Sequence, residues 1–153
     1  MSVQDMGQTR RRAWLGAVIW SVAGIGFTLT FFFGGGPRTF PEDSLRHLAG
    51  AGALAFGFLA TWISLLLTRQ RKDGPPVSDE RDAHVLARSN QATLVVVLVG
   101  IFVLTIGLWV SYEGRGWVPV GWMWFLAYGS VILASLTSAV TTLILDGRMG
   151  AHG

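Results

Sequence analysis

Four long stretches of this chain contain no charged residue, and this pattern constrains the fold more than any other feature. Residues 13–33, 48–68, 92–112 and 116–145 hold no Asp, Glu, Lys or Arg. A soluble domain interleaves charges with apolar residues, because each helix or strand keeps one face in water. Each window instead reaches the ~20 residues that an α-helix needs to cross a ~30 Å hydrocarbon core. The pattern excludes a soluble globular domain and predicts an all-α membrane protein with four transmembrane helices.

Breaker residues between the windows set the ends of the predicted helices. Glycines and proline at 34–37, a Gly-Pro-Pro run at 74–76 and a glycine-rich turn at 113–116 each interrupt helical structure. Pro41 suits the first position of the second helix, where its missing N–H is not needed. The expected organisation is a polar tail (1–12), one four-helix domain (13–145) built as two hairpins with helices at about 13–33, 41–68, 79–112 and 121–145, and a second tail (146–153).

The third helix is expected to be unusually long. No breaker lies between Asp79 and Tyr112, so one continuous helix of roughly 34 residues, or about 50 Å, is predicted. That length exceeds the hydrocarbon core by about 20 Å. We therefore expect its first, polar turns to extend beyond the membrane into the cytoplasm.

Basic residues predict the orientation of the helices. The N-terminal tail, the central loop and the C-terminus hold nine Lys and Arg, against three in the other two loops. The positive-inside rule then places both termini and the central loop in the cytoplasm, in a multi-pass protein of the inner cell membrane. The nine are Arg10, Arg11, Arg12, Arg69, Arg71, Lys72, Arg81, Arg88 and Arg148, and the three are Arg38, Arg46 and Arg115.

The N-terminal arginines allow a second reading. Arg10-Arg11-Arg12 before Ala13-Trp14-Leu15 resembles a twin-arginine export signal. However, the apolar stretch that follows is longer than the central region of a signal peptide, and no small-x-small cleavage site ends it. We therefore expect a retained first helix.

The charge-free windows also exclude classes of function. They contain no Asp, Glu, Lys, Arg or His, whereas proton-coupled transporters and intramembrane enzymes usually need a buried acid or base. The chain has no cysteine, which excludes disulfides, thiolate metal sites and cysteine nucleophiles. Its basic residues flank apolar segments and form no concentrated stripe, so nucleic-acid binding is not expected. No enzymatic activity and no cofactor are predicted.

Two stripes of small residues recur at every fourth position. In lipid, helices associate by close backbone approach and interhelical hydrogen bonds, so such stripes favour helix packing. The alternative for the second stripe is a hydroxyl-lined pathway along the fourth helix. The stripes are Ala49, Ala53, Gly57 and Thr61 in the second helix, and Ser130, Ala134, Ser138 and Thr142 in the fourth.

The start of the third helix carries the strongest local signal. Residues 79–88, here called the docking segment, combine acids near the helix start with His84 and Arg88 at four-residue steps from Glu80. Helix capping and charge pairing are sufficient to explain this pattern. The functional interpretation is that the segment forms a surface on which a partner docks. A divalent metal held by Asp79, Asp82 and His84 is a weaker alternative. The candidate docking residues are Asp79, Glu80, Arg81, Asp82, His84 and Arg88.

This segment resembles one known family. An Asp-Glu-Arg triplet at 79–81, an aliphatic Val85 and a basic Arg88, leading directly into a membrane helix, are similar to small bacterial and archaeal predicted membrane proteins of unknown function. Those proteins carry an Asp-Glu-Arg motif between two helical hairpins. Ser89 stands where this family is expected to have alanine. The resemblance implies a multi-pass inner-membrane protein without assigned catalytic residues.

These observations favour a non-enzymatic accessory or regulatory subunit that acts through contacts. Its expected partners are the lipid bilayer and either another membrane or cytoplasmic protein or a second copy of the chain. The alternative is a small homo-oligomeric transporter or channel that uses the hydroxyls of the fourth helix.

The unequal distribution of Lys and Arg between the two sides predicts a topology that can be tested directly. Because the chain contains no cysteine, single cysteines report their own positions. A membrane-impermeant thiol reagent should label Gly74→Cys only from the cytoplasmic side and Gly114→Cys only from outside. The reverse labelling pattern would contradict the orientation.

Overall fold

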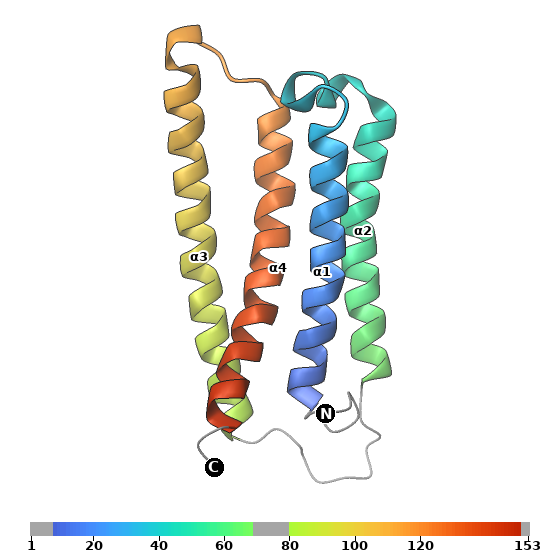
Figure 1. Cartoon of the computed structure of the whole chain (residues 1–153), viewed down its shortest axis with the longest axis vertical. Coiled ribbons are helices and arrows are strands. Elements are labelled where there is room, and N and C mark those ends of the chain that lie inside the picture. Colours follow the sequence, from blue (N-terminus) through green and yellow to red (C-terminus); the bar gives the residue numbers. More distant parts are fainter. Residues whose placement is uncertain (1–7, 69–79, 151–153) are drawn as a thin grey trace.

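The computed structural model describes residues 8–68 and 80–150, and these residues form a four-helix membrane protein. The helices are α1 (Gln8–Phe32), α2 (Ser44–Leu67), α3 (Glu80–Tyr112) and α4 (Gly121–Gly150). Each is long and apolar enough to cross a membrane. They run up and down as two hairpins, and no strand occurs in the described part of the chain (Figure 1). The all-α fold with four transmembrane helices is confirmed.

Three helix ends differ from the sequence prediction by more than one residue. α1 begins at Gln8, before the predicted position 13, because the arginine run is itself helical. α2 begins at Ser44, since Pro41 lies in a short 3₁₀ turn and the Asp43 side chain caps the helix by accepting from two backbone N–H groups. α4 continues to Gly150, past the predicted end at 145. α3 is one continuous helix of 33 residues, as expected.

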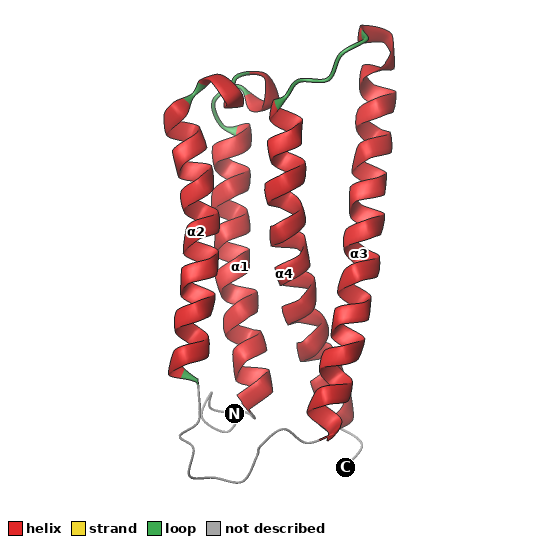
Figure 2. Ribbon diagram, turned by 180° about the vertical axis from the view of Figure 1, so that it is seen from behind, coloured by secondary structure: helices red, strands yellow, loops and turns green. Residues whose placement is uncertain are grey.

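The helices lie in a row in the order α3, α4, α1, α2 (Figures 1 and 2). α4 packs between α3 and α1, and α1 packs between α4 and α2. The chain order therefore differs from the spatial order. Below, the end of the bundle with segments 33–43 and 113–120 is called the loop end, and the opposite end, where α1 and α3 begin, is called the termini end.

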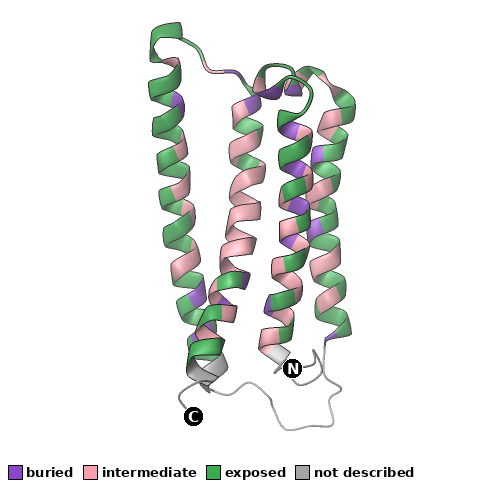
Figure 3. Ribbon diagram, in the orientation of Figure 1, coloured by how far each residue is buried: buried purple, intermediate pink, exposed green. Residues whose placement is uncertain are grey.

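Burial follows this row. α4 is half-buried along most of its length, whereas the outward faces of all four helices are exposed (Figure 3). Exposed side chains on α3 include Leu98, Phe102 and Trp109. Such a large apolar surface suits hydrocarbon, in which an outward-facing leucine or phenylalanine is not penalised. The row thus presents apolar side chains to the lipid.

Arg46 joins the start of α2 to the end of α1. Its Nε and Nη2 donate to the carbonyl oxygens of Thr30 and Phe31, at 3.1 and 2.8 Å. Its Nη1 donates to the Gly34 carbonyl at 3.0 Å and to Thr39 Oγ1 at 2.8 Å. The last carbonyls of a helix have no partner within it, and a cation there also complements the helix dipole. One guanidinium thus caps α1.

Arg12 makes the corresponding contact at the termini end. Its Nε donates to Thr68 Oγ1 at 2.9 Å and its Nη2 donates to the Thr68 carbonyl at 3.1 Å. Thr68 is the C-cap residue of α2. An arginine from each helix therefore caps the C-terminal end of the other, and the α1–α2 hairpin is closed at both ends.

An aromatic cluster fills the loop end. Phe27, Phe31 and Phe40 are at most 1% exposed and pack against rings of α4. Phe31 and Phe125 lie 4.9 Å apart between ring centroids. His47 lies between rings of two elements, 4.7 Å from Phe40 and 4.6 Å from Trp124. This cluster holds α1, α2 and α4 together beneath the loops.

Gly57 lies at a close approach between α2 and α1. A Cβ atom built on Gly57 would lie 2.9 Å from the Trp20 ring, and Trp20 is only 4% exposed. Ala53 Cβ lies 3.9 Å from the position that a Cβ of Gly26 would occupy. Thr61 is half-buried, and its hydroxyl donates to the Gly57 carbonyl at 2.7 Å.

The α2 stripe turns away from α1 at its loop-end member. Ala49 is exposed, and the contact with Phe27 and Phe40 falls instead on its neighbour Gly50. Each step of four residues rotates the position by about 40°, because a helical turn has 3.6 residues. Two steps from Gly57 therefore move Ala49 about 80° away from the α1 contact. Alternating steps of three and four keep Gly50, Ala53 and Gly57 on it.

We expect Gly57→Leu to destabilise the protein by about 1–3 kcal/mol, because the new side chain overlaps the enclosed Trp20 ring. Gly52→Leu is the matched control, since a Cβ at Gly52 meets nothing within 4 Å. Thermal unfolding in mild detergent measures both variants. Equal midpoints for the two variants would contradict the close α1–α2 contact.

Candidate functional site

The docking segment lies at the termini end, at the start of α3. Asp79 lies outside the described residues, as do the side chains of Glu80, Arg81 and Asp82. His84 and Arg88 are described and exposed. Neither side chain has a hydrogen-bond or ion-pair partner within 8–68 and 80–150. These two residues therefore form an open polar face on the first turns of α3.

A neighbouring face of the same turns, about 100° around the helix, is buried against α4. Val85 is 1% exposed and Ser89 is completely buried. Ser89 Oγ lies 2.8 Å from the Ser138 carbonyl oxygen and 3.0 Å from Thr142 Oγ1. Thr142 Oγ1 also lies 2.8 Å from the Ser138 carbonyl oxygen. We call Ser89, Ser138 and Thr142 the hydroxyl joint.

The hydroxyls of Ser89 and Thr142 both have hydrogen-bond partners within the hydroxyl joint. Ser89 donates its proton to the Ser138 carbonyl, and Thr142 donates either to Ser89 Oγ or to the same carbonyl. In membrane proteins such cross-helix hydrogen bonds stabilise by about 0.6 kcal/mol on average, and up to about 1.7. The joint also fixes the rotation of α3, because Ser89 can reach the Ser138 carbonyl only with this face turned toward α4.

α4 is longer than the sequence predicts, since it continues to Gly150 and does not end at 145. Its hydrogen bonds to the start of α3 come from Ser138 and Thr142, which lie within the predicted range of the fourth helix. The start of α3 is therefore held on one face by α4 and open on the neighbouring face of His84 and Arg88.

The α4 stripe is divided between two neighbours. Ser138 and Thr142 contact α3 through the hydroxyl joint, whereas Ser130 lines a groove between α1 and α3. Ala134 is half-buried between these two regions. The rotation of about 40° per four residues again explains the change of face. Ser130 Oγ donates to the Ala127 carbonyl of its own helix at 2.9 Å.

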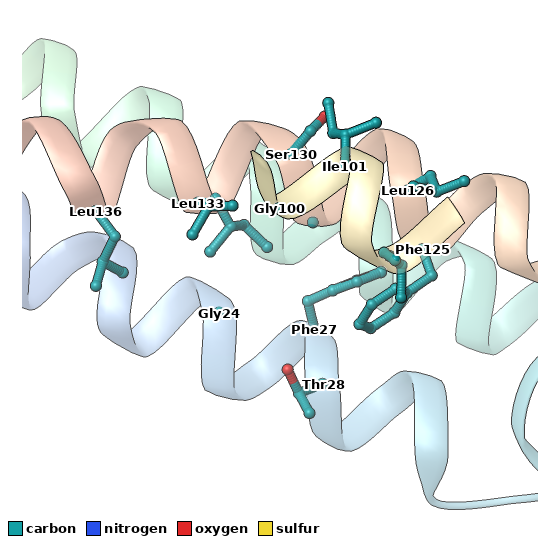
Figure 4. A pocket seen from close by; sticks show the side chains of 13 residues that line it. Gly24, Phe27, Thr28, Gly100, Ile101, Phe125, Leu126, Ser130, Leu133 and Leu136 are labelled. Atoms are coloured by element: carbon teal, nitrogen blue, oxygen red, sulfur yellow. The ribbon is translucent and has the colours of Figure 1, made fainter. Parts of the chain in front are cut away.

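A groove runs along α4 between α1 and α3 (Figure 4). Its volume is about 370 Å³ and its lining is almost entirely apolar. The hydroxyls of Thr28 and Ser130 are the polar side-chain groups in this lining. The lining residues are Gly24, Phe27, Thr28, Gly100, Ile101, Leu104, Phe125, Leu126, Gly129, Ser130, Ile132, Leu133 and Leu136.

Two of the three residues of the metal alternative, Asp79 and the side chain of Asp82, lie outside the described part of the chain. The third, His84, is described and exposed. Within residues 8–68 and 80–150, no group of three His, Asp or Glu side chains is placed to hold a metal ion.

Sequence reasoning missed two residues that organise this molecule. Arg46 contributes only to the topology prediction, and Ser89 enters only as a departure from a family pattern. The repeat of Val85, Ser89 and Thr93 at every fourth position is a usable signal for Ser89, since small and β-branched residues at this spacing favour a helix contact. No comparable pattern identifies Arg46, because its acceptors are mostly backbone carbonyls.

No protein family, curated protein or solved structure matches this chain.

Removing the Ser89 hydroxyl should weaken the α3–α4 contact. We expect Ser89→Ala to lower the free energy of unfolding by about 0.6–1.7 kcal/mol. Ser111→Ala is the control, because that hydroxyl is exposed and donates to the Gly107 carbonyl of its own helix. In a double-mutant cycle with Thr142→Val, Ser89→Ala should show coupling measured by unfolding in detergent. Additive effects would contradict the joint.

Proposed function

We propose that this integral membrane protein is a non-enzymatic accessory or regulatory subunit that acts through its docking segment, residues 79–88. The observation that supports this most is the two-sided start of α3. Ser89 fixes one face to α4 beside the buried Val85, while His84 and Arg88 on the neighbouring face are exposed and have no partner within the described residues. A rigid helix with an open charged face is suited to recognition.

Rigidity matters for the strength of such a contact. Association loses free energy when flexible groups must be ordered at the interface, and a surface that is already fixed avoids much of this loss. The hydroxyl joint fixes the backbone of this face before a partner arrives. Because α3 is continuous, a partner that moves this face also moves the transmembrane part of the helix. A partner bound at the docking segment can therefore change the position of the transmembrane part of α3.

The proposal includes an orientation. The excess of Lys and Arg at the termini end supports a cytoplasmic location for both termini and for the docking segment, in the inner cell membrane. The partner is then a cytoplasmic protein or the cytoplasmic part of another membrane protein, which includes a second copy of this chain.

A small homo-oligomeric transporter or channel has weaker support. Its pathway would follow the hydroxyls of α4, yet the Thr142 hydroxyl is engaged in a buried contact with Ser89 of α3. Ser130 bonds to its own helix and faces a groove with an apolar lining. A polar solute crossing here would lose its hydration without finding replacement partners.

Site-specific photo-crosslinking tests the docking proposal. A photoreactive amino acid placed at His84 or at Arg88 should give one defined adduct in native membranes. The same amino acid at Arg11, which is exposed at the same end on α1, is the control and should not give it.

Charge reversal then tests the motif itself. We expect Glu80→Lys, Arg81→Glu and the double variant each to reduce the adduct by tenfold or more, since like charges placed across an interface disfavour the complex by more than about 1.4 kcal/mol. Arg11→Glu should leave it unchanged. Full adduct yield in all three variants, with normal membrane insertion, would show that the motif serves only as a helix cap.

A further inference from the structure

The groove along α4 has a definite shape. α4 forms its floor from Phe125 to Leu136, while Gly24 and Thr28 of α1 line one side and Ile101 and Leu104 of α3 line the other (Figure 4). Its rims are open, since Thr28 and Ile101 are exposed. The groove therefore opens sideways, toward the medium that surrounds the helices.

The shape and chemistry of the groove suit a hydrocarbon chain. Its floor runs about 17 Å along α4, at ~1.5 Å per residue, and its lining is almost entirely apolar. A hydrocarbon chain has no hydrogen-bonding group, so it can lie along this floor without leaving a polar group unpaired.

The depth of the groove fits one leaflet of a bilayer. Its lining belongs to the charge-free windows 13–33, 92–112 and 116–145. The floor begins at Phe125, one turn below the start of α4 at the loop end, and it continues for about 17 Å. Half of a hydrocarbon core is about 15 Å thick. The groove thus covers the leaflet next to the loop end.

Protein contacts flank the groove at both ends. At the loop end, Phe27 of α1 stacks on Phe125 of α4 with ring centroids 5.8 Å apart. At the termini end, α4 approaches both neighbours, with Ala139 Cβ 3.6 Å from the position of a Cβ on Gly16 and with Ser138 in the hydroxyl joint. The open rims between these contacts make the bilayer the direct source of an occupant.

Charges at the loop end complement a phospholipid. Arg38 and Arg115 are exposed in the two segments that connect the helices there. Their guanidinium groups lie 5.6 Å from the Trp117 ring centroid and 5.3 Å from the Tyr112 ring centroid. Neither makes another hydrogen bond or ion pair within the described residues. Arginine is a strong ligand for phosphate, and aromatic rings prefer the headgroup level.

We propose that the groove binds one acyl chain of an anionic phospholipid from the leaflet at the loop end. The chain lies along α4 between α1 and α3, and the phosphate lies at the level of Arg38 and Arg115. The site requires only that the helices span a bilayer. It does not depend on the docking segment, which lies at the opposite end of the bundle.

Photolabelling with a lipid tests the site. The full chain is reconstituted into phosphatidylcholine vesicles that contain phosphatidylglycerol with a diazirine in its acyl chain. Mass spectrometry should find adducts concentrated on groove residues such as Leu126 and Leu133, at several times the yield of the lipid-facing Leu59 and Ile63 of α2. Equal labelling of the groove and of α2 would overturn the proposal.

Filling the groove provides the decisive variant. Gly129 lines the groove and its Cβ position meets only the Phe125 ring, at 3.9 Å, so Gly129→Leu adds a side chain that fills part of the groove. Labelling of Leu126 and Leu133 should fall by about fivefold or more. Gly107→Leu, where nothing lies within 4 Å of the new Cβ, should not change it. Ser130→Leu, which also fills the groove, provides a second variant if Gly129→Leu does not fold.

The charged end is tested separately. With Arg38→Gln and Arg115→Gln combined, labelling by the phosphatidylglycerol probe should fall to the level seen with a phosphatidylcholine probe of the same acyl chain. Equal labelling by both probes in the unmodified protein would overturn the preference for an anionic lipid. Crosslinks between two copies of the chain at Leu126 or Leu133, in place of lipid adducts, would overturn the acyl-chain site.

Discussion

Hydrocarbon offers no hydrogen-bond partner, and this constraint governs the polar groups that the described helices carry into the membrane. Within residues 8–68 and 80–150, no buried side-chain nitrogen or oxygen lacks a partner. Several hydroxyls of the membrane-spanning helices find an acceptor within their own helix. Thr30, Thr61 and Thr105 each donate to a backbone carbonyl one turn earlier. Ser89 is an exception, since its hydroxyl donates to another helix. That exception is also what fixes α3 in place.

The two hairpins meet the same constraint by different means. In the α1–α2 hairpin, Arg46 and Arg12 each cap the other helix and satisfy carbonyls that the helix geometry leaves open. The α3–α4 hairpin relies on the hydroxyl joint at one end and, at the other, on the Trp122 indole N–H, which donates to the Tyr112 hydroxyl oxygen at 3.2 Å. The first solution places two charged groups at the helix ends. The second uses only neutral groups.

The sequence predicts the number of helices, their approximate bounds and the length of α3, because hydrophobic length and breaker residues are local properties. It does not predict which helices touch. The stripe from Ala49 to Thr61 illustrates the limit: its spacing indicates a contact, but the rotation of the helix places Gly50 there in place of Ala49. Arg46 could not be found as a cap, since the carbonyls that it satisfies belong to another helix. The groove cannot be predicted from the sequence either, because residues of three separate helices line it.

The position of α4 has a consequence for biosynthesis. Translation delivers α1, α2 and α3 to the membrane first, yet α4 is the helix that lies between α1 and α3 in the finished row. The α1–α2 hairpin can close on its own through its two arginines, whereas Ser89 of α3 obtains its partners only when Ser138 and Thr142 have been synthesised. Until then the Ser89 hydroxyl, next to the membrane-spanning part of α3, is open to contacts with other helices. The order of the helices along the chain thus leaves α3 as the segment most exposed to mispairing during assembly.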